Sequence, residues 1–86
     1  MTKVELLNKL ERDGVLDLLV KSGLVSTTFI FYREIYLQVD YRIRLGLKKM
    51  DAYQDFAEQY NVHENTIMNA CKAMNESFTI ESVNVE

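Results

Sequence analysis

Apolar residues recur every three or four positions near the start of the chain, which is the period of a helix that buries one face. Over residues 3–12 this stripe consists of Val4, Leu6, Leu7 and Leu10. Thr2 and Glu5 stand three residues apart at its beginning, which is the spacing of a capping box. The pattern predicts a first helix over 3–12.

A second short helix is predicted over residues 15–21, where the sequence is apolar on most sides, so we expect it to be buried. Asp13-Gly14 precedes it and Gly23 follows it, and glycine is the usual residue just past a helix C-terminus. The leucines of these two helices have an alternative use as an oligomerisation surface. We favour the core, because a small domain needs most of its leucines there.

The longest uninterrupted segment begins at Ser26 or Thr27 and runs to about Leu45. Its β-branched and aromatic residues would equally suit a strand. A helix is favoured because no turn residue interrupts the segment before Gly46, and because apolar side chains recur at helical spacing. The residues with this spacing are Phe29, Tyr32, Tyr36, Val39 and Ile43.

Three tyrosines of this segment, Tyr32, Tyr36 and Tyr41, have a functional alternative as a stacking platform for single-stranded nucleic acid. Such a platform needs exposed rings among basic residues, and only Arg33 and Arg42 are near in sequence. We therefore expect these tyrosines to be half-buried in the core with their hydroxyls toward solvent.

Two further helices are predicted over about 50–60 and 64–75, joined by a tight turn. The residues expected on their inner faces and in the turn are Phe56, Ala57, Tyr60, Val62, Ile67, Ala70 and Cys71. Ala57 is informative, because helices that cross steeply need a small side chain where they come closest. Asn61 stands where the first helix ends, and asparagine tolerates the left-handed backbone found there.

Residues 78–85 alternate apolar and polar side chains, which is a strand-like pattern without an evident partner strand. We expect this tail to be disordered or to pair with a second subunit as an extended arm. The pattern as a whole predicts an all-α single domain over 1–86, a bundle of four or five helices. It divides into a helical scaffold over 1–46, a helix-turn-helix over 47–75 and a short tail over 76–86.

Composition agrees with a helical globular domain. Of the 86 residues, 48% are hydrophobic and 27% are charged, proline is absent and only three are glycine. The single cysteine, Cys71, allows no internal disulfide, which fits a reducing compartment. The sequence contains neither an apolar run long enough to span a bilayer nor a signal-peptide pattern. We therefore expect a cytoplasmic protein without membrane contact.

The formal net charge of −3 argues against strong binding to nucleic acid. Charge is unevenly distributed, however. Residues 42–75 carry five Lys and Arg against four Asp and Glu, whereas the tail carries three acids and no base. A slightly positive segment of this kind predicts weak, salt-sensitive contact with DNA.

Residues 48–75 resemble the helix-turn-helix superfamily of bacterial and phage transcription factors, recombinases and transposases. The positions that carry the resemblance are Phe56, Ala57, Asn61-Val62, Thr66-Ile67 and Ala70. The resemblance implies that the second helix of the pair lies in the major groove of double-stranded DNA. His63 departs from the family, which often has a capping serine at this position, so we expect a poorer cap.

The resemblance also assigns DNA contacts to particular side chains. The residues implied to contact bases are Glu64, Asn65, Met68, Asn69 and Lys72. Those implied to contact the DNA backbone are Arg42, Arg44, Lys48, Lys49, His63 and Thr66. A homodimer is expected, because one weakly basic unit buries too little surface to be selective. The dimer contact would come from the leucine-rich N-terminal helices or from the alternating tail.

Catalysis, a metal, a cofactor and a small-molecule substrate are not expected. The chain has one histidine, His63, and one cysteine, Cys71, which cannot form a metal-binding cluster. It has no glycine-rich phosphate loop. The alternative to DNA binding is a helical protein–protein interaction module, such as an adaptor or anti-repressor, that uses the helix-turn-helix only as a scaffold.

Overall fold

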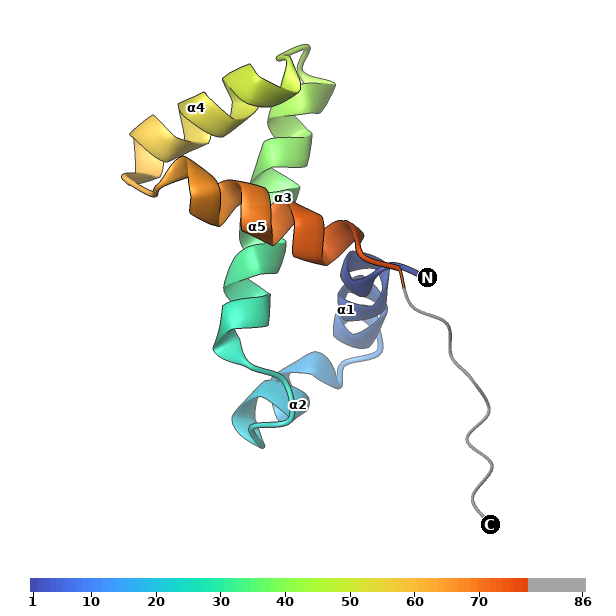
Figure 1. Ribbon diagram of the computed structural model, residues 1–86. Helices are drawn as coiled ribbons and strands as arrows, with labels where there is room; N and C mark the ends of the chain where they lie inside the picture. Colours follow the sequence, from blue (N-terminus) through green and yellow to red (C-terminus); the bar gives the residue numbers. More distant parts are fainter. Residues whose placement is uncertain (78–86) are drawn as a thin grey trace.

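The computed structural model describes residues 1–77, which form five α-helices and no strand (Figure 1). The helices are α1 (Lys3–Arg12), α2 (Leu16–Lys21), α3 (Thr27–Arg44), α4 (Lys49–Tyr60) and α5 (Glu64–Asn75). The all-α bundle predicted from the sequence is therefore confirmed. The predicted helix boundaries agree with the observed ones to within about one residue.

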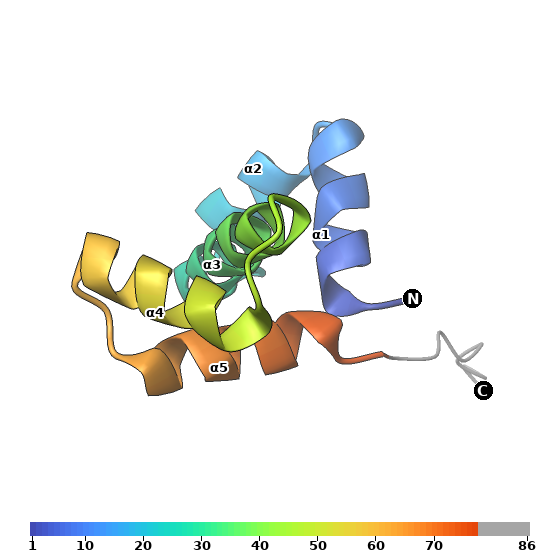
Figure 2. The same cartoon turned by 90° about the horizontal axis from the view of Figure 1, so that it is seen from above.

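The long helix α3 is the axis of the molecule. Figure 2, which looks nearly along α3, shows α4 and α5 on one side of it and α1 on another. Its start is fixed by Ser26, whose hydroxyl accepts a hydrogen bond from the Phe29 N–H at 3.3 Å. Its end is followed by Gly46 at φ 107°, a conformation that glycine adopts without strain. The Ser26 cap, the glycine end and the packing of other helices on two sides of α3 explain why this segment is a helix and not a strand.

The core consists of two connected clusters. The larger one joins α3, α4 and α5 through Ile35, Val39, Ala52, Tyr53, Phe56, Ile67, Ala70 and Cys71. The smaller one joins α1, α2 and α5 through Val4, Leu7, Leu16 and Met74. Met74 is fully buried at the end of α5, so α5 is anchored at both ends of its length.

The structure corrects two expectations about burial. The second helix was expected to be buried, but Leu16 is its only buried residue and Leu18 is 64% exposed. A six-residue helix at the edge of the bundle has room to bury only one side. On α3, Ile35 is fully buried, whereas Phe29 and Ile43 are exposed because they lie beyond the region that α4 and α5 cover.

The turn between α4 and α5 has the predicted conformation. Asn61 ends α4 with φ 52° and ψ 48°, and its N–H donates to the Ala57 carbonyl. Val62 packs against the larger cluster, as does the half-buried Ala57. Tyr60 was expected on the inner face but is exposed, because its ring lies against Phe56 at a centroid distance of 4.6 Å rather than in the core.

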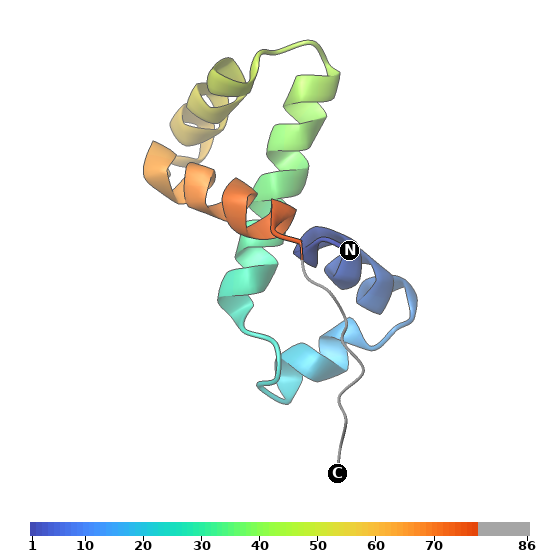
Figure 3. The ribbon, with the colours of Figure 1, turned by 45° about the vertical axis from the view of Figure 1, so that its right-hand side comes forward.

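The end of α5 lies beside the start of α1 (Figure 3). The Lys3 N–H donates to the Glu76 carbonyl at 3.1 Å, and Thr2 and Ser77 form an antiparallel bridge. The predicted capping box is confirmed, since Thr2 and Glu5 hydrogen-bond each other reciprocally. The alternating pattern predicted over 78–85 lies outside the described residues.

The left-handed turn residue gives a first test of the fold. Asn61→Ala is expected to lower the free energy of unfolding by about 1 kcal/mol, because a Cβ without a local polar group is strained at positive φ. Asn61→Gly is the matched control and is expected to leave stability nearly unchanged. Chemical denaturation of both variants measures the difference, and equal stabilities would contradict the assigned role of this backbone conformation.

Candidate nucleic-acid interface

Helix α5 has two sharply different faces. Its buried face consists of Ile67, Ala70, Cys71 and Met74. Its opposite face consists of the exposed side chains Asn65, Met68, Asn69 and Lys72. The second set repeats at three- and four-residue steps, so the four side chains form one stripe along the helix. The structure thus brings together four of the five residues predicted to contact bases, and Glu64 lies half-buried beside them.

The start of α5 is capped by a histidine. The His63 Nδ1 accepts a hydrogen bond from the Asn65 N–H at 3.1 Å, so the departure from serine leaves this helix start capped. The imidazole replaces the serine hydroxyl as the acceptor of an otherwise free peptide N–H. Thr66, predicted to contact the DNA backbone, is half-buried in the first turn of the helix.

A groove runs between the start of α4 and the second half of α5. It is lined by Lys49, Met50, Tyr53, Met68, Asn69, Cys71, Lys72 and Asn75. Lys49 from α4 and Lys72 from α5 therefore border the same hollow, although they are far apart in sequence. Sequence reasoning missed Asn75 and the groove itself, because neither is visible until the crossing of the two helices is known.

The start of α4 adds to this positive region. Lys48 is the N-cap residue of α4 and makes no side-chain capping hydrogen bond. The first peptide N–H groups of α4 therefore lack a side-chain acceptor, and such groups favour an anion. Lys49 lies over the Tyr53 ring, with its Nζ 5.9 Å from the ring centroid.

The floor of the groove is chemically inert. Burial raises the pKa of the Cys71 thiol, which opposes formation of the nucleophilic thiolate. Burial, assisted by the neighbouring Cys71, raises the pKa of Tyr53 to about 12. Both groups keep their protons at neutral pH, so they serve as packing between α4 and α5.

Arg42 does not belong to this interface, contrary to its predicted contact with the DNA backbone. It is buried, and its Nε donates to Asp55 Oδ2 at 2.7 Å. Its other nitrogens donate to the Gln38 carbonyl and to Gln59 Oε1. The guanidinium also lies over the Phe56 ring at 5.3 Å. Each of its three nitrogens therefore donates at least one hydrogen bond inside the protein.

The remaining predicted cations stay at the surface. Arg44 is 80% exposed and pairs with Asp40 at 2.9 Å, one helical turn earlier on α3. Lys48, Lys49 and Lys72 are exposed around the groove. The same two helices also carry Asp51, Glu58 and Glu64, so three carboxylates offset the three lysines of the interface.

The comparisons with known proteins leave the family open. The chain matches no family model, and comparisons with curated proteins and with solved structures give no match. Within residues 1–77, no helix is both long enough and apolar enough to cross a membrane. The same residues contain no group of three or more potential metal ligands.

The buried arginine gives a sharp test of how α4 is held. Arg42→Ala is expected to lower the free energy of unfolding by about 2–4 kcal/mol, because it removes charged hydrogen bonds and leaves a cavity. Arg42→Met should cost less than half as much, because it restores the packed volume without a buried charge. The control Arg44→Ala, at an exposed pair, should cost at most about 0.5 kcal/mol. Equal losses for Arg42→Ala and Arg44→Ala in urea unfolding would contradict this assignment.

The buried tyrosine predicts a pH dependence of stability. The pKa of Tyr53 is 10.0 in the unfolded chain and about 12 in the folded protein. The unfolded chain therefore releases this proton first, and the free energy of unfolding falls as pH rises from 10 to 12. Tyr53→Phe removes this contribution, so its stability should fall less steeply over that interval. Parallel slopes for the two proteins in denaturation series would contradict the burial of the hydroxyl.

Proposed function

We propose that this protein binds double-stranded DNA without catalysis, by placing the exposed face of α5 in the major groove. It would act as a transcriptional regulator or accessory factor in the cytoplasm of a bacterium, or for a phage or mobile element. The observation that carries the proposal is the division of α5 into two faces. One face is fully used in the core, and the other presents only side chains that suit base edges, next to a groove bordered by two lysines.

The dimensions and chemistry of α5 fit the major groove, which is about 12 Å wide and admits one helix. Asn65 and Asn69 carry amides that can pair bidentately with adenine. Lys72 can donate to guanine or to a phosphate, and Met68 can contact a thymine methyl group. Glu64, half-buried at the start of the helix, can accept from cytosine.

The groove beside α5 would hold the sugar-phosphate backbone. Lys49 and Lys72 border it from the two helices, and Lys48 stands at the adjacent start of α4. The first peptide N–H groups of α4 favour the same charge. Contacts of this kind position a protein on the duplex, and base contacts then select the sequence. The resemblance to the helix-turn-helix superfamily supports the same arrangement.

Three lysines make the electrostatic contribution small. Each phosphate neutralised contributes about −0.9 to the slope of log K against log salt, so three contacts predict a slope of about −3. Asp51, Glu58 and the net charge of −3 weaken binding further. We therefore propose modest affinity that depends strongly on salt.

A protein-interaction module is the second candidate. It is favoured by large apolar side chains in open positions, among them Leu24 at 77% exposure and Leu45 at 67%. Both lie away from the face of α5, however, so they explain neither its polar stripe nor the lysines beside it. The two candidates differ in whether α5 itself contacts the partner.

Binding to random duplex DNA across a salt series tests the proposal. The unmodified protein is expected to bind at low salt with a slope of about −3, and Lys72→Ala should reduce that slope by about 1. The double variant Lys48→Glu/Lys49→Glu should abolish measurable binding. Fluorescence anisotropy of a labelled duplex provides the affinity at each salt concentration.

A second double variant controls for net charge. Lys9→Glu/Lys21→Glu changes the charge by the same amount at exposed lysines of α1 and α2 that pair with Asp13 and Asp17. It should bind DNA almost as the unmodified protein does. Absence of binding at low salt by the folded, unmodified protein would rule the proposal out, and equal losses in both double variants would remove α4 and α5 from it.

A further inference from the structure

One face of α3 is exposed over most of its length, although Gln38 at its centre is half-buried and accepts hydrogen bonds from Arg42. It is formed by residues separated alternately by four and three positions: Thr27, Phe31, Glu34, Gln38, Tyr41 and Leu45. We call this stripe the seam. This spacing is that of the contact face in a two-helix coiled coil. Phe31 and Tyr41 on the seam are exposed, Tyr41 by 60% of its surface. Aromatic side chains usually contribute much of the energy of protein cores and interfaces, so two exposed rings on one face indicate a contact surface.

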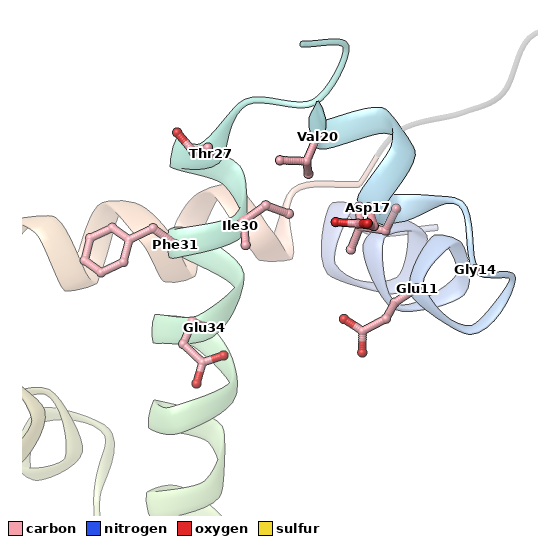
Figure 4. Close-up of a pocket in the computed structure, with 9 residues that line it drawn as sticks. Glu11, Gly14, Asp17, Val20, Thr27, Ile30, Phe31 and Glu34 are labelled. Carbon is pink, nitrogen blue, oxygen red and sulfur yellow. The ribbon is translucent and has the colours of Figure 1, made fainter. Parts of the chain in front are cut away.

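At the N-terminal end of the seam lies an open groove between α2 and α3, which we call the acidic groove (Figure 4). Its floor is apolar and includes Val20 and Ile30. Three carboxylates belong to its lining, from Glu11, Asp17 and Glu34. Glu11 and Asp17 pair with Arg33 and Lys21, whereas Glu34 forms no ion pair within residues 1–77.

At the C-terminal end of the seam the nearby charged side chains are basic instead of acidic. Arg44 is the last residue of α3, and Lys48 follows in the α3–α4 loop. The loop also carries the exposed side chains of Leu45 and Leu47. We call residues 44–48 the basic end. Arg44 pairs with Asp40, so the basic end offers mainly Lys48 and its exposed leucines, which complement Glu34 and the apolar floor of the acidic groove.

We propose that a second copy of this chain packs antiparallel along the seam, so that the basic end of each copy occupies the acidic groove of the other. An antiparallel alignment centred on Tyr36 places Phe31 opposite the second copy's Tyr41. The same alignment places Glu34 opposite Gln38 and Thr27 opposite Leu45. Aromatic residues then meet aromatic residues, and a carboxylate meets an amide that can donate to it.

The position of the two ends explains why the occupant is a second copy. The acidic groove and the basic end lie on one face of the same helix, about 27 Å apart for 18 residues. In an antiparallel dimer the acidic groove of each copy contacts the basic end of the other, which closes the assembly with two-fold symmetry. In a head-to-tail pair one groove and one basic end would have no partner. A stable interface buries about 800 Å² per partner. The seam alone is narrow, so the two end contacts are needed to reach that size.

This interface leaves out the exposed face of α5 and shares only Lys48 with the proposed DNA contacts. Helix α5 packs on the side of α3 around Tyr36 and Val39, roughly opposite the seam. The dimer therefore leaves both exposed faces of α5 free and directs them away from each other. If α5 binds DNA, such a dimer holds two duplex segments instead of two half-sites of one duplex.

Sedimentation equilibrium measures the state of the full chain without DNA. The unmodified protein is expected to show twice its chain mass of 10.1 kDa. Tyr41→Glu should return it to the monomer mass, because the charge would lie against Phe31 of the second copy. Leu24→Glu is the matched control, since Leu24 is even more exposed but lies off the seam, and it should stay dimeric. Circular dichroism confirms that both variants are folded.

Charge reversal tests the pairing itself. Asp17→Lys/Glu34→Lys makes the groove basic, and Arg44→Glu/Lys48→Glu makes the other end acidic. Each double variant alone is expected to be monomeric, because like charges then meet at both ends. An equimolar mixture should form a heterodimer, because each reversed site finds its complement. A monomeric unmodified protein, loss of the dimer in Leu24→Glu alone, or no heterodimer in the mixture would overturn the proposal.

Discussion

The buried guanidinium of Arg42 is the interaction on which the placement of α4 depends. A charge taken out of water costs several kcal/mol unless hydrogen bonds and an opposite charge compensate it. Asp55 and Gln59 supply these from α4, Gln38 supplies a carbonyl from α3, and the Phe56 ring covers the cation. Because these partners come from two helices, the pairing fixes the angle at which α4 leaves the α3–α4 loop. Helix α5 packs on both α3 and α4, so the direction of its exposed face follows from the same interaction.

Sequence patterns predicted the helix boundaries well because the residues that begin and end each helix act on their near neighbours in the chain. Thr2 with Glu5, Ser26, Gly46 and Asn61 each act within three or four residues, and the structure shows each of them at a helix end. The inward face of α5 was predicted for the same reason, since one helical period determines it. The role of Arg42 was not predictable in this way, because its partner Asp55 lies thirteen residues away on another helix. Ile35 was missed because the covered face of α3 is decided by where α4 and α5 cross it.

The candidate interface likewise has one part that local sequence determines and one part that only the packing of the helices determines. The stripe from Asn65 to Lys72 was visible in the sequence, whereas the groove shared by Lys49 and Lys72 depends on how two helices cross. What remains exposed is chemically sparse, with two amides, one thioether and one lysine on α5. Such a face has hydrogen-bonding specificity but little electrostatic attraction. A second copy packed along the seam would add no charge to either face, and it would direct the second face toward a separate duplex segment.

Nuclear magnetic resonance can show whether the exposed face of α5 contacts DNA. Titration of a short duplex into ¹⁵N-labelled protein at low salt reports every amide separately, including the side-chain NH₂ groups of Asn65 and Asn69. We expect the largest shifts on those side chains, on the backbone of Met68 and Lys72, and at the start of α4. Shifts confined to the seam or to the α2–α3 region, or no shifts with a folded protein, would contradict this contact.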